Sequence, residues 1–188
     1  QQVSHLPKYV NPTKNKMTKI LWFTGFLGTG KSTLVKILSS KLSQLNFKVK
    51  IIDGDDFRKK NKNNNNFSKT NIIKNNLSII NHVKKIQKKY DFILVSVISP
   101  LLKTRNIARI KFGKNYFEIY VKCKIETLVK RDTKKLYAKA KKNIIKNLIG
   151  YNSNIKYEMS RYKKITINTD KLSKFKSIKT IIKRVFNN

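Results

Sequence analysis

Residues 25–32 read GFLGTGKS, the pattern G-x-x-x-x-G-K-[ST] of a phosphate-binding loop. This motif needs a strand before it and a helix after it, and the sequence predicts both. Residues 20–24 form a short apolar run, and apolar side chains recur at helical spacing over residues 34–42. Three of the six glycines lie in the motif, where they let the backbone curl and aim successive N–H groups at phosphate oxygens. The stretch predicts a nucleotide-phosphate site at a helix N-terminus.

Two side chains of this loop have predicted chemistry. Lys31 would reach the β- and γ-phosphates of a bound nucleotide as a point charge, and the Ser32 hydroxyl would hold Mg²⁺. The nucleotide-binding residues predicted from the loop are Gly25, Phe26, Leu27, Gly28, Thr29, Gly30, Lys31, Ser32 and Thr33.

Length and composition favour one folded domain. The chain has 188 residues, of which 39% are hydrophobic, enough to bury a core. Residues 1–18 contain two prolines and no apolar periodicity, so we expect a leader or linker there and the folded domain over residues 19–188. No apolar run approaches the roughly 20 residues of a membrane span, which predicts no membrane partner. The single cysteine is typical of a reducing compartment. The first residues contain no signal-peptide apolar core, which predicts a cytoplasmic protein.

The formal charge of +35 raises the question of nucleic-acid binding. Of the 44 basic residues 38 are lysine, whereas arginine is the residue that reads base edges and grips phosphate bidentately. The lysines are spread along the chain, and no base-reading motif accompanies them. We therefore expect weak attraction to polyanions but no specific nucleic-acid partner.

Strand and helix patterns alternate from residue 20 onward. Predicted strands cover residues 20–24, 47–52, 90–98, 116–121 and 164–168. Predicted helices cover residues 34–42, 71–89, 101–110, 125–131 and 174–186, with a polar loop over 59–70 and a very basic segment over 134–146. This alternation predicts an α/β fold whose mostly parallel sheet is covered by helices on both faces.

Polar side chains follow several of these strands. Asp53 and Asp55 come directly after the second strand, and three of the nine acidic residues fall within residues 53–56. Such carboxylates could take a proton from an acceptor hydroxyl or bind Mg²⁺ through water. Ligands bind at the carboxyl ends of parallel strands, so we expect the loop, the two aspartates and Ser99 to converge there.

Several short motifs follow one another along the chain: WFTG at 22–25, DGD at 53–55 with Arg58, Phe67-Ser68, ISP at 98–100, Arg131-Asp132 with Leu136-Tyr137, and Lys146-Asn147 followed by Gly150. They occur in the order seen in adenylyl-sulfate kinases, which the chain resembles from about residue 20 to its end. In that family ATP phosphorylates the 3′-hydroxyl of adenosine 5′-phosphosulfate. The resemblance implies a three-layer P-loop nucleoside-kinase fold with a basic lid.

The same resemblance implies ATP and Mg²⁺ as the cofactors and a small nucleotide as the substrate. It also implies a sulfate adenylyltransferase domain or subunit as a partner, and a homodimer. For the metal it implies Ser32 and Asp55. Its catalytic candidates are Lys31, Asp53 as the base, and Ser99, which matches a serine recorded in the family as a phosphoserine; direct in-line transfer needs no such intermediate.

The family also implies which residues bind the two substrates. Arg131 would lie near the base of ATP. Acceptor contacts would come from Asp55, Arg58 on the phosphosulfate, Phe67 stacked on adenine, Asn75, Ile98, Ser99, and Lys146 from the lid.

The chain departs from the family pattern on the acceptor side. Asn71-Ile72 stands where the family has Asp-Arg, Leu148 replaces the second phenylalanine of the adenine clamp, and Lys141 replaces a lid arginine. Losing a stacking partner costs roughly 1 kcal/mol, and losing a charged hydrogen bond costs about 1.5–3 kcal/mol. These losses predict an acceptor affinity roughly a hundredfold lower, unless Lys60, Lys62 or Lys74 compensates.

Three functions therefore stay open from the sequence. The first is a kinase of adenylyl sulfate. The second is a related kinase of another small nucleotide-linked or anionic acceptor, because the ATP-side residues match better than the acceptor-side ones. The third is a degenerate nucleotide-binding module of a longer polypeptide, against which the intact Lys31, Ser32, Asp53 and Asp55 argue.

Overall fold

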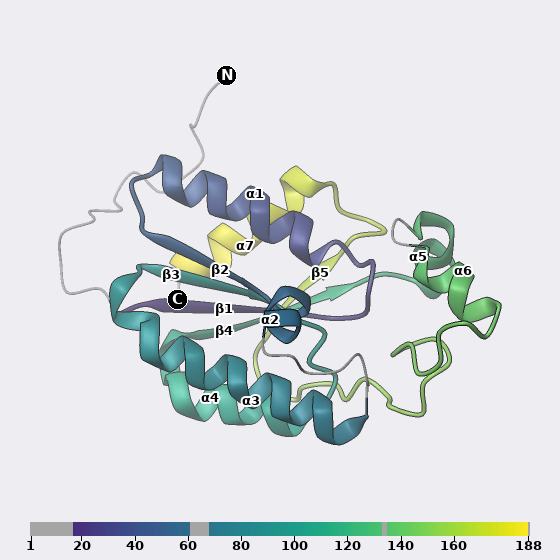
Figure 1. Ribbon diagram of the computed structural model, residues 1–188. Coiled ribbons are helices and arrows are strands. Elements are labelled where there is room, and N and C mark those ends of the chain that lie inside the picture. Colours follow the sequence, from purple (N-terminus) through teal and green to yellow (C-terminus); the bar gives the residue numbers. More distant parts are fainter. Residues whose placement is uncertain (1–16, 61–67, 133–134, 188) are drawn as a thin grey trace.

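The protein folds around a five-stranded sheet in which every strand pair is parallel (Figure 1). The computed structural model describes residues 17–60, 68–132 and 135–187. The strand order is β2-β3-β1-β4-β5. The strands are β1 (Lys19–Thr24), β2 (Val49–Asp53), β3 (Phe92–Ser96), β4 (Tyr116–Lys122) and β5 (Ile165–Asn168). The α-helices are α1 (Lys31–Gln44), α2 (Gly54–Lys60), α3 (Lys69–Ile86), α4 (Leu102–Phe112), α5 (Ile125–Arg131), α6 (Leu136–Lys141) and α7 (Lys174–Phe186).

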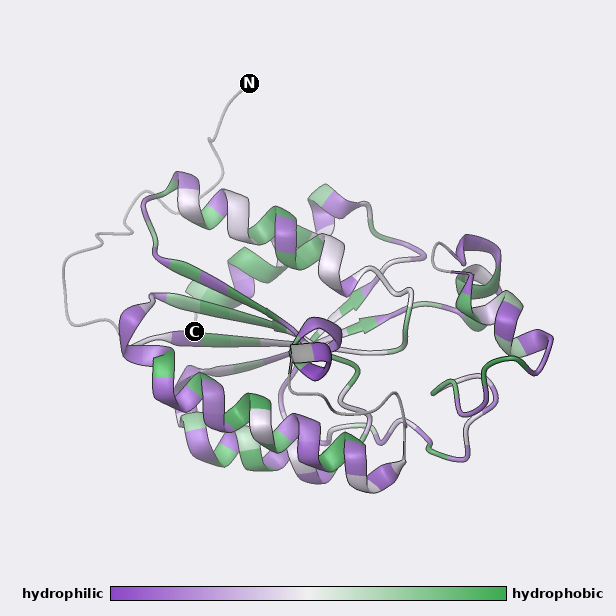
Figure 2. Ribbon diagram, in the orientation of Figure 1, coloured by the Kyte–Doolittle hydropathy of each residue, from purple (hydrophilic) through white to green (hydrophobic). Residues whose placement is uncertain are grey.

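Helices cover both faces of the sheet, as predicted, because the central strand is apolar on both sides. In β1, Leu21 and Phe23 pack into a core with α1 and α7. Their neighbours Ile20 and Trp22 point to the opposite face and pack into a second core with α3 and α4. Figure 2 shows the central strands mostly hydrophobic and the helices mixed in hydropathy, the pattern of a sheet buried on both faces.

Local signals set several helix boundaries close to the predicted ones. Ser68 is the N-cap residue of α3, and its side chain accepts a hydrogen bond from Asn71 N at 3.3 Å. Ser173 caps α7 in the same way through Lys176 N at 3.2 Å. Such caps satisfy N–H groups that have no partner within the helix. The predicted range 174–186 is therefore the observed range of α7.

The segment after β2 contains a helix that was not predicted from the sequence. It forms the short helix α2, with Asp55 and Asp56 in the first turn, where carboxylates favour the positive end of a helix. A Cβ at Gly54 would lie 2.7 Å from Val97, so only glycine lets this helix start so close to the end of β3. The predicted strands over 47–52 and 90–98 also extended too far, because an apolar run does not reveal where backbone pairing stops.

Helices α5 and α6 lie beyond the carboxyl ends of the strands (Figure 1). The predicted basic segment contains α6, but this helix is not fully solvated, because its Tyr137 and Ala140 are buried against Leu128 and Leu148. No helix in the described ranges is long and apolar enough to cross a lipid bilayer.

Candidate functional site

The phosphate-binding loop connects β1 to α1 and has the conformation that its glycines predict. Gly25, Gly28 and Gly30 all have positive φ angles, of 134°, 78° and 93°. A Cβ at Gly25 would overlap the carbonyl oxygen of Val121 on β4, so the loop approaches that strand too closely for any side chain. The helix N-terminus behind the loop contributes a positive electrostatic end for an anion.

Lys31 lies under this loop and is 7% exposed. Its ammonium donates hydrogen bonds to the carbonyl oxygens of Gly25 at 2.9 Å and Phe26 at 2.6 Å. The Thr29 hydroxyl also donates to Phe26 O, at 3.0 Å. The lysine charge is therefore held inside the curve of the loop, where a nucleotide phosphate would meet it.

Oxygen donors from three elements meet beside the loop. The Ser32 hydroxyl donates to Asp53 Oδ2 at 2.9 Å and lies 3.1 Å from the Ser96 hydroxyl at the end of β3. Asp53 Oδ1 accepts from Asp55 N at 3.0 Å, which orients the carboxylate at the start of α2. A hydroxyl and a carboxylate so close together are ligands that suit Mg²⁺, which is otherwise held by water and substrate phosphates.

One cavity of about 880 Å³ brings most of the nucleotide-side predictions together. Residues 27–33 of the loop form one wall, and Asp53, Asp55, Ile98 and Arg131 also line it. Gly25 and Phe26, the first two residues of the loop, do not line the cavity. Asp132, Leu136 and Tyr137 belong to the family motifs but were not predicted as site residues, and they line it. The other lining residues that were not predicted are Leu34, Ser96, Val97, Thr169, Leu172, Ser173, Lys174, Phe175 and Ser177.

The missed residues after β5 form the end of the cavity near Arg131. The Arg131 guanidinium donates to the carbonyl oxygen of Thr169 at 3.0 Å, which fixes the arginine beside the carboxyl end of β5. Leu172 and Phe175 lie on the same side, and Phe175 is 62% exposed. The available signal was topological: the carboxyl end of every strand in a parallel sheet belongs to the ligand edge.

The acceptor-side predictions are more dispersed. Arg58 is half-buried, and burial lowers the pKa of its guanidinium while Asp55 opposes that shift. Asn75 is 1% exposed, and neither polar atom of its side chain has a hydrogen-bond partner among the described residues. Lys146 is exposed, and Phe67 lies outside the described residues. An unsatisfied buried amide is costly, but Asn75 does not line the cavity, so its contact with the acceptor stays a prediction.

Ser99 lies behind the cavity wall. It is 1% exposed, its hydroxyl lies 3.4 Å from that of Thr104, and it does not line the cavity. Its backbone has a φ angle of 44°, in the left-handed region, which costs a non-glycine residue of the order of 1 kcal/mol or more. Its predicted catalytic role stays a prediction.

Two of the residues that depart from the family pattern, Ile72 and Leu148, pack in apolar clusters. Ile72 is buried with Leu101 and Ile149 in a small core beside Phe26. Leu148 is 7% exposed and supports α6. Both side chains therefore stabilise the chain around the site, and neither supplies a polar contact.

The segment that contains α6 is tied to the loop and is capped by a carboxylate. Tyr137 donates its hydroxyl to Leu27 O at 2.8 Å, and burial raises the pKa of this phenol to about 12. Desolvation raises the pKa of Asp132, but hydrogen bonds from three backbone N–H groups outweigh it, so the pKa lies below its usual range. These donors belong to Ala138, Tyr137 and Leu136.

Across residues 17–60, 68–132 and 135–187, no group of three or more His, Cys, Asp or Glu side chains could hold a metal ion by itself. A divalent cation at this site would need phosphate oxygens or water in addition to Ser32 and Asp53.

Comparison with known proteins agrees with this geometry. The adenylylsulphate kinase family model matches residues 17–168. An adenylyl-sulfate kinase of Clostridium acetobutylicum is 34% identical over 180 residues, which is 93% of this chain and 88% of the relative. The structure of the Mycobacterium tuberculosis APS kinase CysC in complex with AMPPNP and APS superposes with a TM-score of 0.78 at 25% identity, covering 92% of this chain and 98% of that one. A bifunctional enzyme CysN/CysC of Xylella fastidiosa is 30% identical over 158 residues, 84% of this chain and 25% of that enzyme.

Proposed function

The chain belongs to the adenylyl-sulfate kinase family, and from that premise we propose that it transfers the γ-phosphoryl group of ATP to the 3′-hydroxyl of adenosine 5′-phosphosulfate. The observation that carries the proposal is the single cavity lined by residues 27–33, Asp53, Asp55 and Arg131. It provides a phosphate cradle, two carboxylates and a place for a nucleotide base along one sheet edge. The products are ADP and 3′-phosphoadenylyl sulfate.

In the proposed mechanism the protein positions the reactants and stabilises charge. The N–H groups of the loop and the Lys31 ammonium hold the β- and γ-phosphates of ATP. The oxygen of the acceptor hydroxyl forms the new P–O bond as the bond to the β-phosphate oxygen breaks, and Asp53 takes the hydroxyl proton. Its carboxylate is held by the Ser32 hydroxyl and Asp55 N, so it is oriented before substrate arrives.

Mg²⁺ fits this donor set. Ser32 and Asp53 would hold it beside the phosphates, with Asp55 through water. When bound, the ion neutralises charge on the phosphate oxygens. Asp53 is thus a candidate both for the general base and for a ligand of the metal.

On the acceptor side we propose that Arg58 meets the phosphosulfate, that Asn75 hydrogen-bonds to the acceptor, and that Ile98 forms the wall beside it. The support is the partial burial of Arg58 and the unsatisfied amide of Asn75. Lys146 would approach the substrate only after a movement of the basic segment, which we propose as a lid.

A kinase of another small anionic acceptor is the second candidate. The observation that favours it is the burial of Ile72 and Leu148 in apolar clusters, which leaves two acceptor contacts of the family unfilled. We further propose that the protein works beside a sulfate adenylyltransferase domain or subunit, which the bifunctional CysN/CysC relative supports. A homodimer and a cytoplasmic location are part of the same proposal.

The test is a coupled ATP-turnover assay with MgATP, with and without adenylyl sulfate, at moderate salt to limit nonspecific nucleotide binding. We expect acceptor-dependent turnover, and a loss of at least roughly a hundredfold in Lys31→Ala with its fold retained. Lys36→Ala, an exposed lysine on α1, is the control and should keep full activity. ATP binding without acceptor-dependent turnover would favour the second candidate, and absence of ATP binding would favour the degenerate module.

A further inference from the structure

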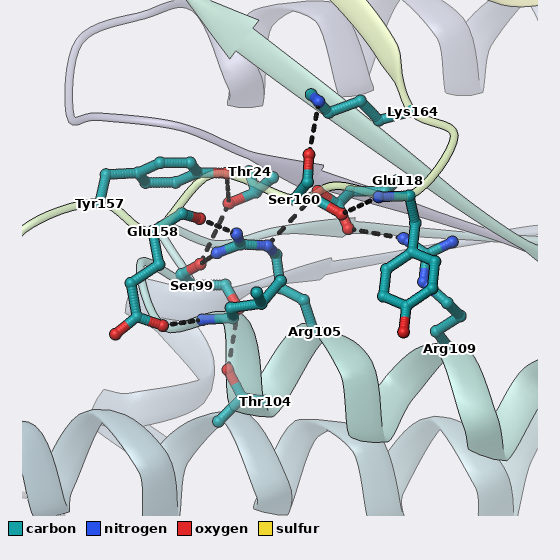
Figure 3. A network of polar contacts seen from close by, with 12 residues as sticks. Thr24, Ser99, Thr104, Arg105, Arg109, Glu118, Tyr157, Glu158, Ser160 and Lys164 are labelled. Carbon is teal, nitrogen blue, oxygen red and sulfur yellow. Dashed lines mark hydrogen bonds and ion pairs between the residues drawn. The ribbon is translucent and has the colours of Figure 1, made fainter.

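Helix α4 carries two arginines one turn apart, and both contact one buried carboxylate (Figure 3). Arg105 Nε lies 3.4 Å from Glu118 Oε1, and Arg109 Nη2 lies 3.0 Å from Glu118 Oε2. Arg105 is fully buried, and Glu118 on β4 is 2% exposed. Burying such charges is expensive unless every one of them is paired, so the arrangement needs a reason beyond packing.

Arg105 differs from Arg109 because it also grips two backbone segments. Its Nη1 donates to the carbonyl oxygen of Ser99 at 2.5 Å, and its Nη2 donates to the carbonyl oxygen of Glu158. These segments are 59 positions apart in the chain, and the planar guanidinium fork is the side chain that can hold two such acceptors at fixed angles. Arg109 instead lies over the ring of Tyr162, with its Cζ atom 4.6 Å from the ring centroid.

Glu158 reinforces the same junction from its own side. Its backbone N–H donates to Pro100 O at 2.9 Å, and its carboxylate accepts from Leu102 N at 2.6 Å. Residues 157–160, which we call the strap, are thereby joined to the loop over residues 98–100 that follows β3. The strap lies in the connection between the α6 segment and β5.

Tyr157 extends the strap to the phosphate-binding loop. Its hydroxyl lies 3.0 Å from Thr24 Oγ1. The centroid of its ring lies 5.0 Å from that of Tyr120 in a stacked pair and 5.8 Å from that of Phe26 in a T-shaped pair. Thr24 Oγ1 also donates to Ile98 O at 2.5 Å. The contacts of Arg105 and Tyr157 therefore converge on the stretch whose Ile98 lines the cavity.

We propose that Arg105 is a positioning residue for the acceptor: it fixes the loop over residues 98–100 against the strap and so places the cavity wall that carries Ile98. The inference rests on the proposed function for the identity of the acceptor. In this assignment the strap belongs to the fixed frame of the site. Arg105 does not line the cavity, so its effect passes through the Ser99 backbone.

The kinetic test compares Arg105→Lys with Arg109→Lys, two variants that each keep a positive charge near Glu118. A lysine at 105 cannot bridge both carbonyls, so we expect kcat/KM for adenylyl sulfate to fall roughly tenfold or more, while KM for ATP stays within about twofold. Arg109→Lys should leave both parameters within about twofold. Equal losses in the two variants, or equal losses for both substrates, would show that Arg105 only balances charge.

A second measurement is independent of the substrate. Amide hydrogen exchange in the ligand-free protein reports the hydrogen bonds of Leu102 N and Glu158 N. We expect faster exchange at both amides in Arg105→Lys and unchanged exchange in Arg109→Lys. If the wild-type protein does not use adenylyl sulfate, the proposed function fails, but exchange still decides whether Arg105 joins the two segments.

A milder pair covers the case in which Arg105→Lys does not fold. Tyr157→Phe removes only the hydroxyl contact with Thr24. Tyr162→Phe removes the hydroxyl of a ring that packs on Arg109, and Tyr162 is 54% exposed. Faster exchange at Leu102 and Glu158 in Tyr157→Phe alone supports the strap. Identical exchange in the two variants overturns it.

Discussion

Among single residues, Asp53 has the most sharply testable role. Its Oδ2 accepts from Ser32 at 2.9 Å and its Oδ1 from Asp55 N at 3.0 Å, so it contacts both the loop and α2. If Asp53 is the base, Asp53→Asn leaves the Kd for MgATP nearly unchanged while kcat falls roughly a hundredfold or more. Calorimetry and single-turnover assays measure the two quantities. Asp56→Asn is the control, because Asp56 is exposed and does not line the cavity.

An equal loss of ATP binding in Asp53→Asn would move this carboxylate from the base role to that of a metal ligand. Titration of the variant with Mg²⁺ would then restore ATP binding in part, because a weakened site fills at higher ion concentration.

Among the elements, α6 depends on one carboxylate at its N-terminus. Asp132 accepts from the N–H groups of Leu136, Tyr137 and Ala138, and these hydrogen bonds hold its pKa below the ordinary value of about 4. A depressed folded-state pKa gives stability that is present above the ordinary pKa and lost as the pH falls through the folded value. We therefore expect α6 to loosen below about pH 4, and Asp132→Ala to loosen it at neutral pH by about 1 kcal/mol.

Limited proteolysis and amide exchange over residues 136–141 measure that loosening. Glu126→Ala in α5 is the control, since Glu126 is exposed. If amide exchange over residues 136–141 of Asp132→Ala still becomes faster in acid, a group other than Asp132 causes the acid sensitivity.

The junction between the phosphate-binding loop and residue 150 gives a second element-scale prediction. Gly150 has a φ angle of 87°, and a Cβ there would lie 2.6 Å from two ring atoms of Phe26. Gly150→Ala should therefore reduce the free energy of unfolding by about 1–2 kcal/mol for the backbone, and by a further 1–3 kcal/mol for the overlap. Urea denaturation measures both costs. The double variant Gly150→Ala/Phe26→Leu should regain the stability lost to the overlap but not the stability lost to the backbone strain. If it regains none, the structure relieves the overlap elsewhere.

At the scale of the whole molecule, the charge of +35 acts on stability. Only nine acidic residues oppose 44 basic ones, so the folded state concentrates like charge and repels itself. Raising NaCl from about 20 to about 200 mM shortens the Debye length to below roughly 10 Å and should raise Tm by a few degrees. Differential scanning fluorimetry measures Tm in NaCl and again in sucrose of equal osmolality. The comparison separates the screening of charges by salt from the exclusion of solutes from the protein surface. A Tm that does not rise with salt would show that the lysines are too dispersed to repel.

Short patterns of neighbouring residues are enough to predict the loop, the alternation of strands and helices, and the family. The same patterns placed Lys31, Ser32 and Asp53 at the cavity and gave the full range of α7. The packing of distant segments, in contrast, brings Thr169 and Phe175 to the cavity and buries Ile72 and Leu148 in apolar clusters. The tertiary structure alone revealed the contact between Arg105 and Glu158, whose residues are 53 positions apart. Such contacts depend on how distant segments pack, and local sequence patterns do not predict that packing.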